Sequence, residues 1–507
     1  MRRFLSILSS RLPVLAGIVV IAAALGIAFH LRGNLPDAWR LLSIHANSPL
    51  FSDTRTITHA IDCLKSGLNP YTVKAFDPWH RTYNYPPIWL DLRHLGVTSR
   101  TSNLMGTTLA ILTVCSLLLL FKARTWTAAT LIFLAVTSRA VLFCLERGNV
   151  DQLILFLLVA VFLLIDRLRP DIKTAIIASL VILLTVLKIY PAAAVLVLVR
   201  NRMGALIALL TARVAVATLL LAAGGTLPLI LANTPHSIFA SFGSFPVFVA
   251  FGDHLLRLPT KSIQQHAQMA SIAGILVATL SLLAGVLFRR RLDRCLPPLD
   301  FNRARGCIAV TCLSIYCFVF LLGSNFDYRL IFLLGVLAYL VDDLNRRESL
   351  RSLPAAIFLV VFLWKPDHLS LKFEILDGVI FAFACAWLGT SLLDNLQLLR
   401  TSVRSPAPRS VRVAYLAILN ARWQHPAGQA QSPLLPLLRN VISASTATST
   451  SRPARTPGSK LSSFRNPPPP TMTGTSGSPP SAMPPTEPPA SSTTTTRSSA
   501  SSTTTHA

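Results

Sequence analysis

The chain has 507 residues, of which 52% are hydrophobic and only 13% are charged. A soluble domain carries about 25% charged residues, so this composition excludes an ordinary soluble protein. Lysine and arginine outnumber the acidic residues by 47 to 21, which gives a net charge of +26. On a soluble protein this excess would indicate nucleic-acid binding. Here the basic residues cluster in short segments between apolar runs, so we attribute the excess to the positive-inside rule.

Apolar runs near the length needed to cross a hydrocarbon core of about 30 Å follow one another along the chain. The runs lie at 13–30, 104–121, 126–144, 150–165, 174–199, 204–232, 269–288, 306–323, 329–341, 354–364 and 375–393. The predicted fold is all-α, a polytopic integral membrane protein with about 10 to 12 membrane helices, one pair of them re-entrant. The first run resembles a signal peptide, but no clean cleavage site follows it, so an uncleaved helix with the N-terminus inside is expected.

Four parts are predicted along the chain. They are an N-terminal segment with the first helix (1–30), a first outer loop (31–103), a multi-helix membrane domain (104–395) with an outer loop at 233–268, and a cytoplasmic tail (396–507). The tail is rich in Ser, Thr and Pro, a composition that cannot bury enough apolar surface to fold, so it is predicted to be disordered.

The run at 174–199 has basic residues at both ends, and the positive-inside rule places both ends on the same side. Lys188-Ile189-Tyr190-Pro191 interrupts it, and proline removes a helical hydrogen bond and disfavours helix in the residue before it. A re-entrant hairpin of two short helices with Lys188 near its tip satisfies both ends. A single tilted span, with frustrated topology downstream, is the alternative.

With the hairpin, most of the unusual polar motifs fall on the outer face. They are Asp53, the Asn-Pro-Tyr turn at 69–71, the Tyr-Pro-Pro turn at 85–87, the 146–151 segment, Lys188 and the 325–329 segment. Each has a simpler interpretation: Asp53 could cap a helix, and the charges of the 146–151 and 325–329 segments could pair locally. Lys188 is harder to explain away, since a lysine inside the bilayer costs about 2.5–3.5 kcal/mol and needs a partner or an anion.

Together these residue types indicate sugar transfer. A carboxylate at the membrane edge can accept the proton of an attacking hydroxyl, while arginine and lysine can hold a lipid-linked phosphate. Aromatic rings can stack on a pyranose, with Trp89 among the candidates. Contacts to acceptor or sugar are expected from Asn69, Tyr71, Tyr83, Tyr85, Asp327, Tyr328 and Arg329. No Walker motif, dinucleotide fingerprint or nucleotide-sugar site is found, so the donor would come from the membrane. The eight cysteines have no metal-ligand or disulfide spacing.

Three motifs resemble family 87 of the glycosyltransferases, part of the GT-C superfamily, over roughly residues 13–340. They are Asp53 with Gly67-Leu68-Asn69-Pro70-Tyr71 and Tyr85-Pro86-Pro87, then Arg147-Gly148-Asn149-Val150-Asp151, then Leu187-Lys188-Ile189-Tyr190-Pro191. The resemblance is weaker to about residue 395 and absent from the tail. The best-known members are α-mannosyltransferases that use polyprenyl-phosphate-mannose.

The resemblance implies that Asp53 is the general base. It implies donor-binding roles for Arg147, Asn149, Asp151, Lys188 and Tyr190. The diaspartate pair of metal-using GT-C enzymes is missing, so no metal or cofactor is expected beyond the polyprenyl-phosphate sugar itself.

The expected partners are membrane lipid, the donor, and a glycolipid or polysaccharide acceptor, with no nucleic acid; the sequence points to no known protein partner. The expected location is a bacterial plasma membrane, with the site on the outer face. A transporter or flippase for a lipid-linked sugar is the alternative function, and a non-catalytic scaffold is a third.

Overall fold

The computed structural model describes residues 2–235, 237–238, 240–254, 267–346, 350–366 and 371–404. All of them belong to one contact unit, Met1–Val413. The predicted tail therefore lies almost wholly outside the described residues. The last helix continues to Arg404, past the predicted start of the tail at 396.

The described residues form helices almost throughout. The first half contains α1 (Arg2–Arg32), α2 (Leu35–Leu41), α3 (Ser52–Lys65), η1 (Pro87–Leu95), η2 (Ser99–Thr101), α4 (Ser102–Leu120), α5 (Trp126–Val136), α6 (Arg139–Arg147), α7 (Asp151–Leu164), η3 (Ile165–Arg167), α8 (Pro170–Leu187) and η4 (Tyr190–Leu198). The second half contains α9 (Arg202–Ala223), α10 (Leu227–Asn233), β1 (Ser241–Phe242), α11 (Ser244–His254), α13 (Ala267–Leu287), α14 (Arg289–Cys295), α15 (Ala304–Leu321), β2 (Asn325–Phe326), η5 (Asp327–Phe332), α16 (Leu333–Arg346), η6 (Leu350–Ser352), α17 (Leu353–Leu363) and α18 (Leu371–Arg404).

Eight helical stretches among the described residues are long and apolar enough to cross a membrane. They are Ser9–Arg32, Ser99–Leu120, Trp126–Arg147, Pro170–Leu187, Met203–Ala223, Met269–Leu287, Ala304–Leu321 and Leu371–Leu396. The protein is therefore an all-α, multi-pass membrane protein, as predicted. Helices α7, α16 and α17, which were also predicted as apolar runs, have only 14, 14 and 11 residues.

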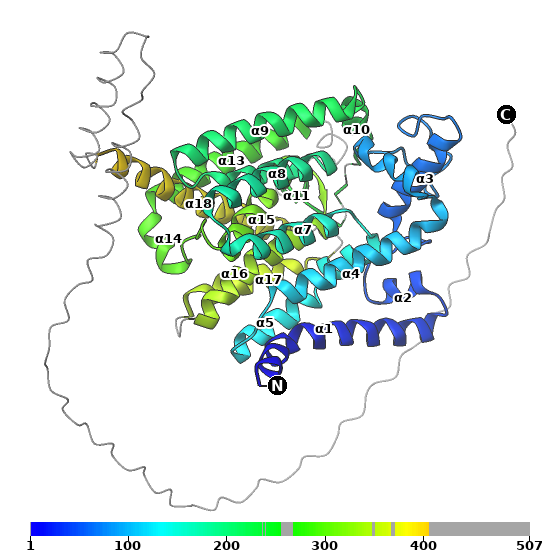
Figure 1. Ribbon diagram of the computed structural model, residues 1–507. Helices are drawn as coiled ribbons and strands as arrows, with labels where there is room; N and C mark the ends of the chain where they lie inside the picture. The colour runs from blue at the N-terminus through cyan, green and yellow to red at the C-terminus, as the bar shows by residue number, and fades with distance from the viewer. Residues whose placement is uncertain are drawn as a thin grey trace, which may run out of the picture. The chain divides into compact units, whose positions relative to one another are not determined.

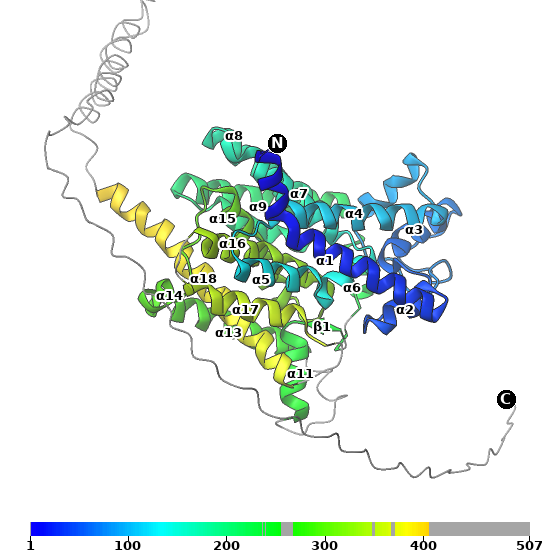
Figure 2. The same ribbon diagram turned by 90° about the horizontal axis from the view of Figure 1, so that it is seen from below.

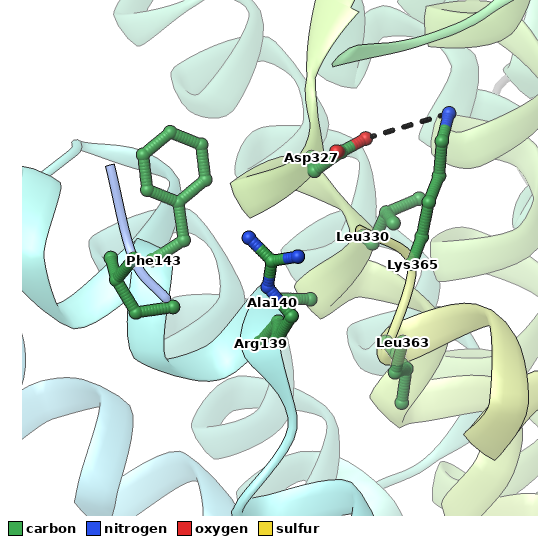
Figure 3. Close-up of a pocket in the computed structure, with 8 residues that line it drawn as sticks. Arg139, Ala140, Phe143, Asp327, Leu330, Leu363 and Lys365 are labelled. Carbon is green, nitrogen blue, oxygen red and sulfur yellow. Dashed lines mark ion pairs between the residues drawn. The ribbon is translucent and has the colours of Figure 1, made fainter. Parts of the chain in front are cut away.

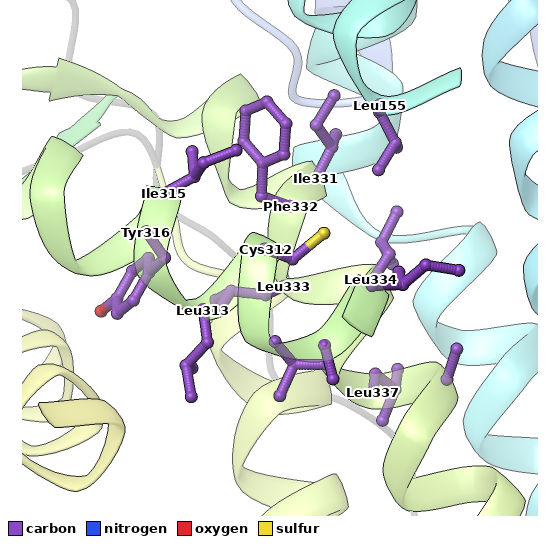
Figure 4. Packing of buried hydrophobic residues seen from close by; sticks show 14 of the residues in the cluster. Leu155, Cys312, Leu313, Ile315, Tyr316, Ile331, Phe332, Leu333, Leu334 and Leu337 are labelled. Carbon is purple, nitrogen blue, oxygen red and sulfur yellow. The ribbon is translucent and has the colours of Figure 1, made fainter. Parts of the chain in front are cut away.

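Helix α15 is the centre of the core. Within its membrane-length window 83% of the residues are buried, against 17% in α1, so α15 is enclosed by other helices while α1 faces outward. Figure 4 shows side chains of α15 packed against those of η5 and α16, with Leu155 of α7 beside them. These residues belong to one continuous apolar cluster that spans the bundle, which holds the surrounding helices in place.

The chain turns back at Lys188, as the sequence predicts. Helix α8 ends at Leu187, Lys188 is extended (φ −162°, ψ 141°), and η4 follows. Lys173 near the start of α8 donates to Asn302 O (3.1 Å), and Arg200 just after η4 contacts Cys307 Sγ (3.4 Å), so both arms end beside the start of α15. The arms differ from the prediction of two short helices: α8 has 18 residues, about 27 Å long, and the returning arm is a 3-10 helix of nine residues.

The two large predicted outer loops contain more structure than expected. The 31–103 segment forms α2, α3, η1 and η2, and Figures 1 and 2 both show α3 beyond one end of α4. The 233–268 segment contains β1 and α11, and β1 pairs antiparallel with β2, with Ser241 opposite Phe326. This two-stranded ladder joins the segment to η5, which enters the candidate site.

Candidate functional site

The start of α3 is joined to the turn between α6 and α7. Phe51 N donates to Glu146 O (3.1 Å), and Thr54 Oγ1 donates to Gly148 O (2.5 Å). Phe51 itself adopts the left-handed conformation (φ 61°, ψ 46°), which is uncommon for a bulky residue. Its ring packs against Gly106 and Gly148. These contacts fix the first turn of α3, which carries Asp53.

Gly148 has a conformation and a position that only glycine tolerates. Its φ is +58°, and a Cβ would lie 2.7 Å from Thr54 Oγ1 and 3.0 Å from the Phe51 ring. We expect Gly148→Ala to destabilise the protein by more than the roughly 1–2 kcal/mol of left-handed strain alone. Thermal unfolding in detergent measures this, with Gly96→Ala as the matched control, because Gly96 has φ +76° and nothing within 4 Å of a Cβ. Equal losses in the two variants would show that the close approach to α3 does not matter.

The Asn149 side chain contacts four other side chains of the site. Its side chain is fully buried, and its Nδ2 lies 2.5 Å from Asp53 Oδ2, 3.1 Å from the Tyr85 hydroxyl and 3.0 Å from the Tyr328 hydroxyl. Its Oδ1 accepts from Lys188 Nζ (2.9 Å). One amide thus orients a carboxylate on one side and a lysine on the other.

Asp151 lies beneath Asn149 and is shared by two cations. Its Oδ1 accepts from Lys188 Nζ (2.7 Å) and from the Tyr190 hydroxyl, and its Oδ2 lies 3.5 Å from Arg329 Nε. Asp151 is fully buried. Asp151, Lys188 and Arg329 form one layer of the site. Because one carboxylate faces two cations, this layer has a net charge of +1. The group around Asn149 is called the Asp53 cluster below and comprises Asp53, Asn149, Asp151, Lys188, Tyr190 and Arg329.

Asp53 is the carboxylate of this cluster that reaches the surface. Its side chain is 13% exposed, whereas that of Asp151 is fully buried. It lies in the first turn of α3 without capping the helix, so the helix-cap interpretation is wrong. Arg81 Nη1 is 3.8 Å away, and Arg81 also bonds Asp77 and Ser52 O. Burial alone would lower the pKa of Arg81, but Asp77 and Asp53 raise it, so Arg81 stays charged beside Asp53.

Tyr85 borders the same carboxylate. Burial and then the negative charge of Asp53 raise the pKa of Tyr85 well above its ordinary value, so the hydroxyl remains neutral. The Lys188 ammonium lies 5.4 Å from its ring centroid. Tyr85 is therefore part of the wall between the carboxylate and the lysine.

Arg147, predicted to bind the donor, points away from the Asp53 cluster. Its Nη1 donates to Ser52 Oγ (2.8 Å), its Nε is 3.3 Å from the fully buried Glu146, and its guanidinium lies over the rings of Phe143 and Phe326. Glu146 compensates the charge of Arg147. The structure therefore contains the local ion pair that was the simpler interpretation of this segment.

The predicted stacking residues of the outer segment are structural. Tyr71, Tyr83 and Trp89 are buried, and Tyr71 and Tyr83 pack edge to face. The Tyr71 hydroxyl donates to Tyr85 O (3.0 Å) and the Tyr83 hydroxyl to Pro86 O (3.0 Å). Trp89 Nε1 donates to Leu187 O (2.9 Å). Asn69 Oδ1 accepts from Tyr71 N (3.0 Å), which closes a turn. Tyr71, Tyr83 and Trp89 pack together near the end of α8, whereas Asn69 is exposed. Their role as contacts to sugar or acceptor stays a prediction.

Asp327 belongs to a second buried group. Its Oδ1 is 4.0 Å from Lys365 Nζ, which is 2.7 Å from Glu374 and donates to Ser241 O (2.7 Å). Asp377, one turn beyond Glu374, accepts from Tyr316 (2.9 Å). Figure 3 shows Asp327 and Lys365 facing each other at a cavity of about 10 Å³ with Arg139 nearby. Such a cavity holds about one water. This ionic group links η5 and β1 to α18 and to Lys365 just beyond α17, and it is separate from the Asp53 cluster.

Sequence reasoning therefore found Asp53, Asn149, Asp151, Lys188, Tyr190, Tyr85, Tyr328 and Arg329 as neighbours, but it missed other members. Arg81 and Ser52 touch the site from the outer segment. The second buried group contains Lys365, Glu374 and Asp377. The sequence could have indicated this group, because charged side chains that border apolar helices are costly and are usually paired. The described residues contain no group of three or more His, Cys, Asp or Glu placed to hold a metal ion.

Comparison with known proteins gives no family for this chain: no protein-family model, curated protein or solved structure matches it.

Proposed function

We propose that the protein is a membrane glycosyltransferase of GT-C type. It would transfer a sugar, with mannose expected, from a polyprenyl-phosphate donor to a lipid or glycan acceptor. The observation that carries the proposal is the placement of Asp53 and Lys188 on opposite sides of one buried amide, Asn149. Asp53, with a side chain 13% exposed, is thus held beside two cations of similar exposure, Lys188 (11%) and Arg329 (14%).

The proposed reaction uses both sides of Asn149. The acceptor hydroxyl attacks the anomeric carbon, its proton passes to Asp53, and the carbon–oxygen bond to the phosphate breaks with inversion. The leaving phosphate takes the electron pair, and Lys188 and Arg329 stabilise its charge. Arg329 replaces Arg147 in this role, because Arg147 is held by Glu146 and Arg329 shares Asp151 with Lys188.

The sidedness of the reaction follows the basic segments. Those at the ends of the α8–η4 hairpin and around α14 would be cytoplasmic by the positive-inside rule. Figures 1 and 2 show α14 and α3 at opposite ends of the bundle. The Asp53 cluster, at the α3 end, would then face outside, in a bacterial plasma membrane.

The test supplies radiolabelled polyprenyl-phosphate-mannose to membranes that contain the protein. The proposal expects label in a new lipid or glycan. Label that crosses the bilayer while still attached to the polyprenyl phosphate would instead establish the flippase, which the broken α8–η4 hairpin also suits. Absence of both results would leave the non-catalytic scaffold.

A further inference from the structure

A large apolar cavity lies at the other end of the bundle from α3. It has a volume of about 470 Å³, within the range of about 300–1,000 Å³ typical of ligand pockets. It lies between α14, α15, α16, α17 and α18, and its wall includes Leu313, Val336, Phe358, Phe383 and Trp387. It is open on one side, since Phe358 and Phe383 are 53% and 56% exposed. None of its lining residues belongs to the Asp53 cluster, so it is a separate feature.

The mouth of this cavity is basic. Arg294 and Cys295 of α14 line it, together with Arg351. Arg351 is paired with Asp343 (3.2 Å), whereas Arg294 is exposed and has no ion pair among the described residues. Its neighbours Arg290 and Arg291, on the same short helix, are also without an acidic partner there. An apolar cavity therefore opens beside an uncompensated positive charge.

The connection after α14 is fixed over the cavity. Trp387 Nε1 donates to Pro297 O (3.0 Å), and the Tyr339 hydroxyl donates to Pro298 O (2.5 Å). The rings of Tyr339 and Trp387 lie 6.3 Å apart. Because these bonds tie the chain after Arg294 to α16 and α18, Arg294 is held at the mouth of the cavity.

The charge and the location identify the chemistry of the occupant. The segment around α14 is one of the basic segments that the positive-inside rule places at the cytoplasmic leaflet. That leaflet carries anionic lipids, and basic pockets between membrane helices on this side bind their head groups. A guanidinium pairs well with phosphate, and an apolar cavity accommodates an acyl chain.

We propose that the cavity binds an anionic glycerophospholipid, with an acyl chain between α15 and α18 and the phosphate at Arg294. This site is independent of the proposed sugar transfer. It would anchor the α14 end of the bundle in the inner leaflet.

Native mass spectrometry of the protein purified from membranes with equal phosphatidylglycerol and phosphatidylcholine tests the proposal. Wild type should retain phosphatidylglycerol. Arg294→Gln should retain about fivefold less, since one basic residue near the surface is worth about that factor. The matched control is Arg303→Gln, an exposed residue at the same end that pairs with Asp300 (3.3 Å), and it should retain the wild-type amount.

A second pair of variants tests the cavity. Ala355→Trp fills the wall, whereas Ile357→Trp lies on the same helix with a 45% exposed side chain that does not line the cavity. Only Ala355→Trp should lose the lipid, with thermal unfolding showing that both variants are folded. Cys295 gives a readout without substitution, because it is the exposed one of the eight cysteines. Its alkylation by a water-soluble maleimide should slow when phosphatidylglycerol is added.

Three results would overturn the proposal: equal lipid retention in Arg294→Gln and Arg303→Gln, equal retention in Ala355→Trp and Ile357→Trp, or a retained lipid that is a polyprenyl phosphate. If Ala355→Trp fails to fold, the proposal is still tested by comparing Arg294→Gln with Arg303→Gln and by the rate of Cys295 alkylation.

Discussion

Asp53→Asn should lower sugar transfer by about 10²–10⁴-fold, the contribution of a positioned general base. The amide has nearly the shape of the carboxylate and can still accept from Asn149 Nδ2, which lies 2.5 Å from Asp53. It cannot take up the proton of the acceptor hydroxyl. The rate should therefore fall while the amount of folded protein in the membrane stays the same, measured as initial rates of transfer from labelled polyprenyl-phosphate-mannose.

Asp91→Asn is the matched control for this variant. Asp91 lies in η1 of the same outer segment, but its side chain is exposed and outside the Asp53 cluster. Its removal should leave the rate unchanged. A similar loss in both variants would mean that the negative charge of the outer segment, and not the proton acceptor at Asp53, supports the rate.

Asp151→Asn should destabilise the protein by about 3–5 kcal/mol, because it leaves the buried Lys188 and the largely buried Arg329 without their shared anion. Lys188 Nζ is 2.7 Å and Arg329 Nε 3.5 Å from this carboxylate, which is fully buried. Adding Lys188→Met should restore part of the loss, since it removes one of the two uncompensated charges. Thermal and denaturant unfolding in detergent measure both effects.

The comparison for this prediction is an exposed ion pair. Asp293 is 3.8 Å from Arg289, and its side chain is 47% exposed, so Asp293→Asn should cost at most about 1 kcal/mol. If Asp151→Asn were as mild as Asp293→Asn, Lys188 and Arg329 would have other sources of compensation, and the description of the Asp53 cluster as a charge-coupled unit would be wrong.

Much of the fold could be predicted from the sequence because the membrane restricts it. The apolar runs and basic segments predicted the membrane helices, and the Lys188–Pro191 break predicted where the chain turns back. Matching basic ends on 174–199 implied a hairpin, and Lys173 and Arg200 do end beside the same helix, α15. Membrane depth alone was then enough to bring Asp53, Asn149 and Lys188 together.

The depth of a residue in the membrane does not determine the direction in which its side chain points. The predictions that differ from the structure concern side-chain direction. Asp327 and Arg329 are two residues apart in a 3-10 helix, which has three residues per turn, so they face different neighbours: Lys365 and Asp151. Arg147 comes two residues before Asn149 in sequence but faces back toward Glu146. The sequence predicts a sugar-binding surface on the aromatic outer segment, but the Tyr71 and Tyr83 hydroxyls bond backbone carbonyls of the same segment, and only the Tyr85 hydroxyl faces Asn149.

The left-handed Phe51 could not have been foreseen either, since a bulky residue rarely adopts that conformation. Its conformation depends on glycines at 106 and 148, which are distant in sequence and leave room for its ring. The orientation of Asp53 is thus set by tertiary contacts of its neighbour.

Sugar transfer with Asp53 as the base is tested with purified protein in liposomes, supplied with radiolabelled polyprenyl-phosphate-mannose and an acceptor extract from the same membranes. We predict that wild type produces labelled acceptor and an equal amount of free polyprenyl phosphate, and that Asp53→Asn produces neither. Near-normal transfer by Asp53→Asn, or wild-type protein that moves the intact donor across the bilayer without releasing polyprenyl phosphate, would contradict the account.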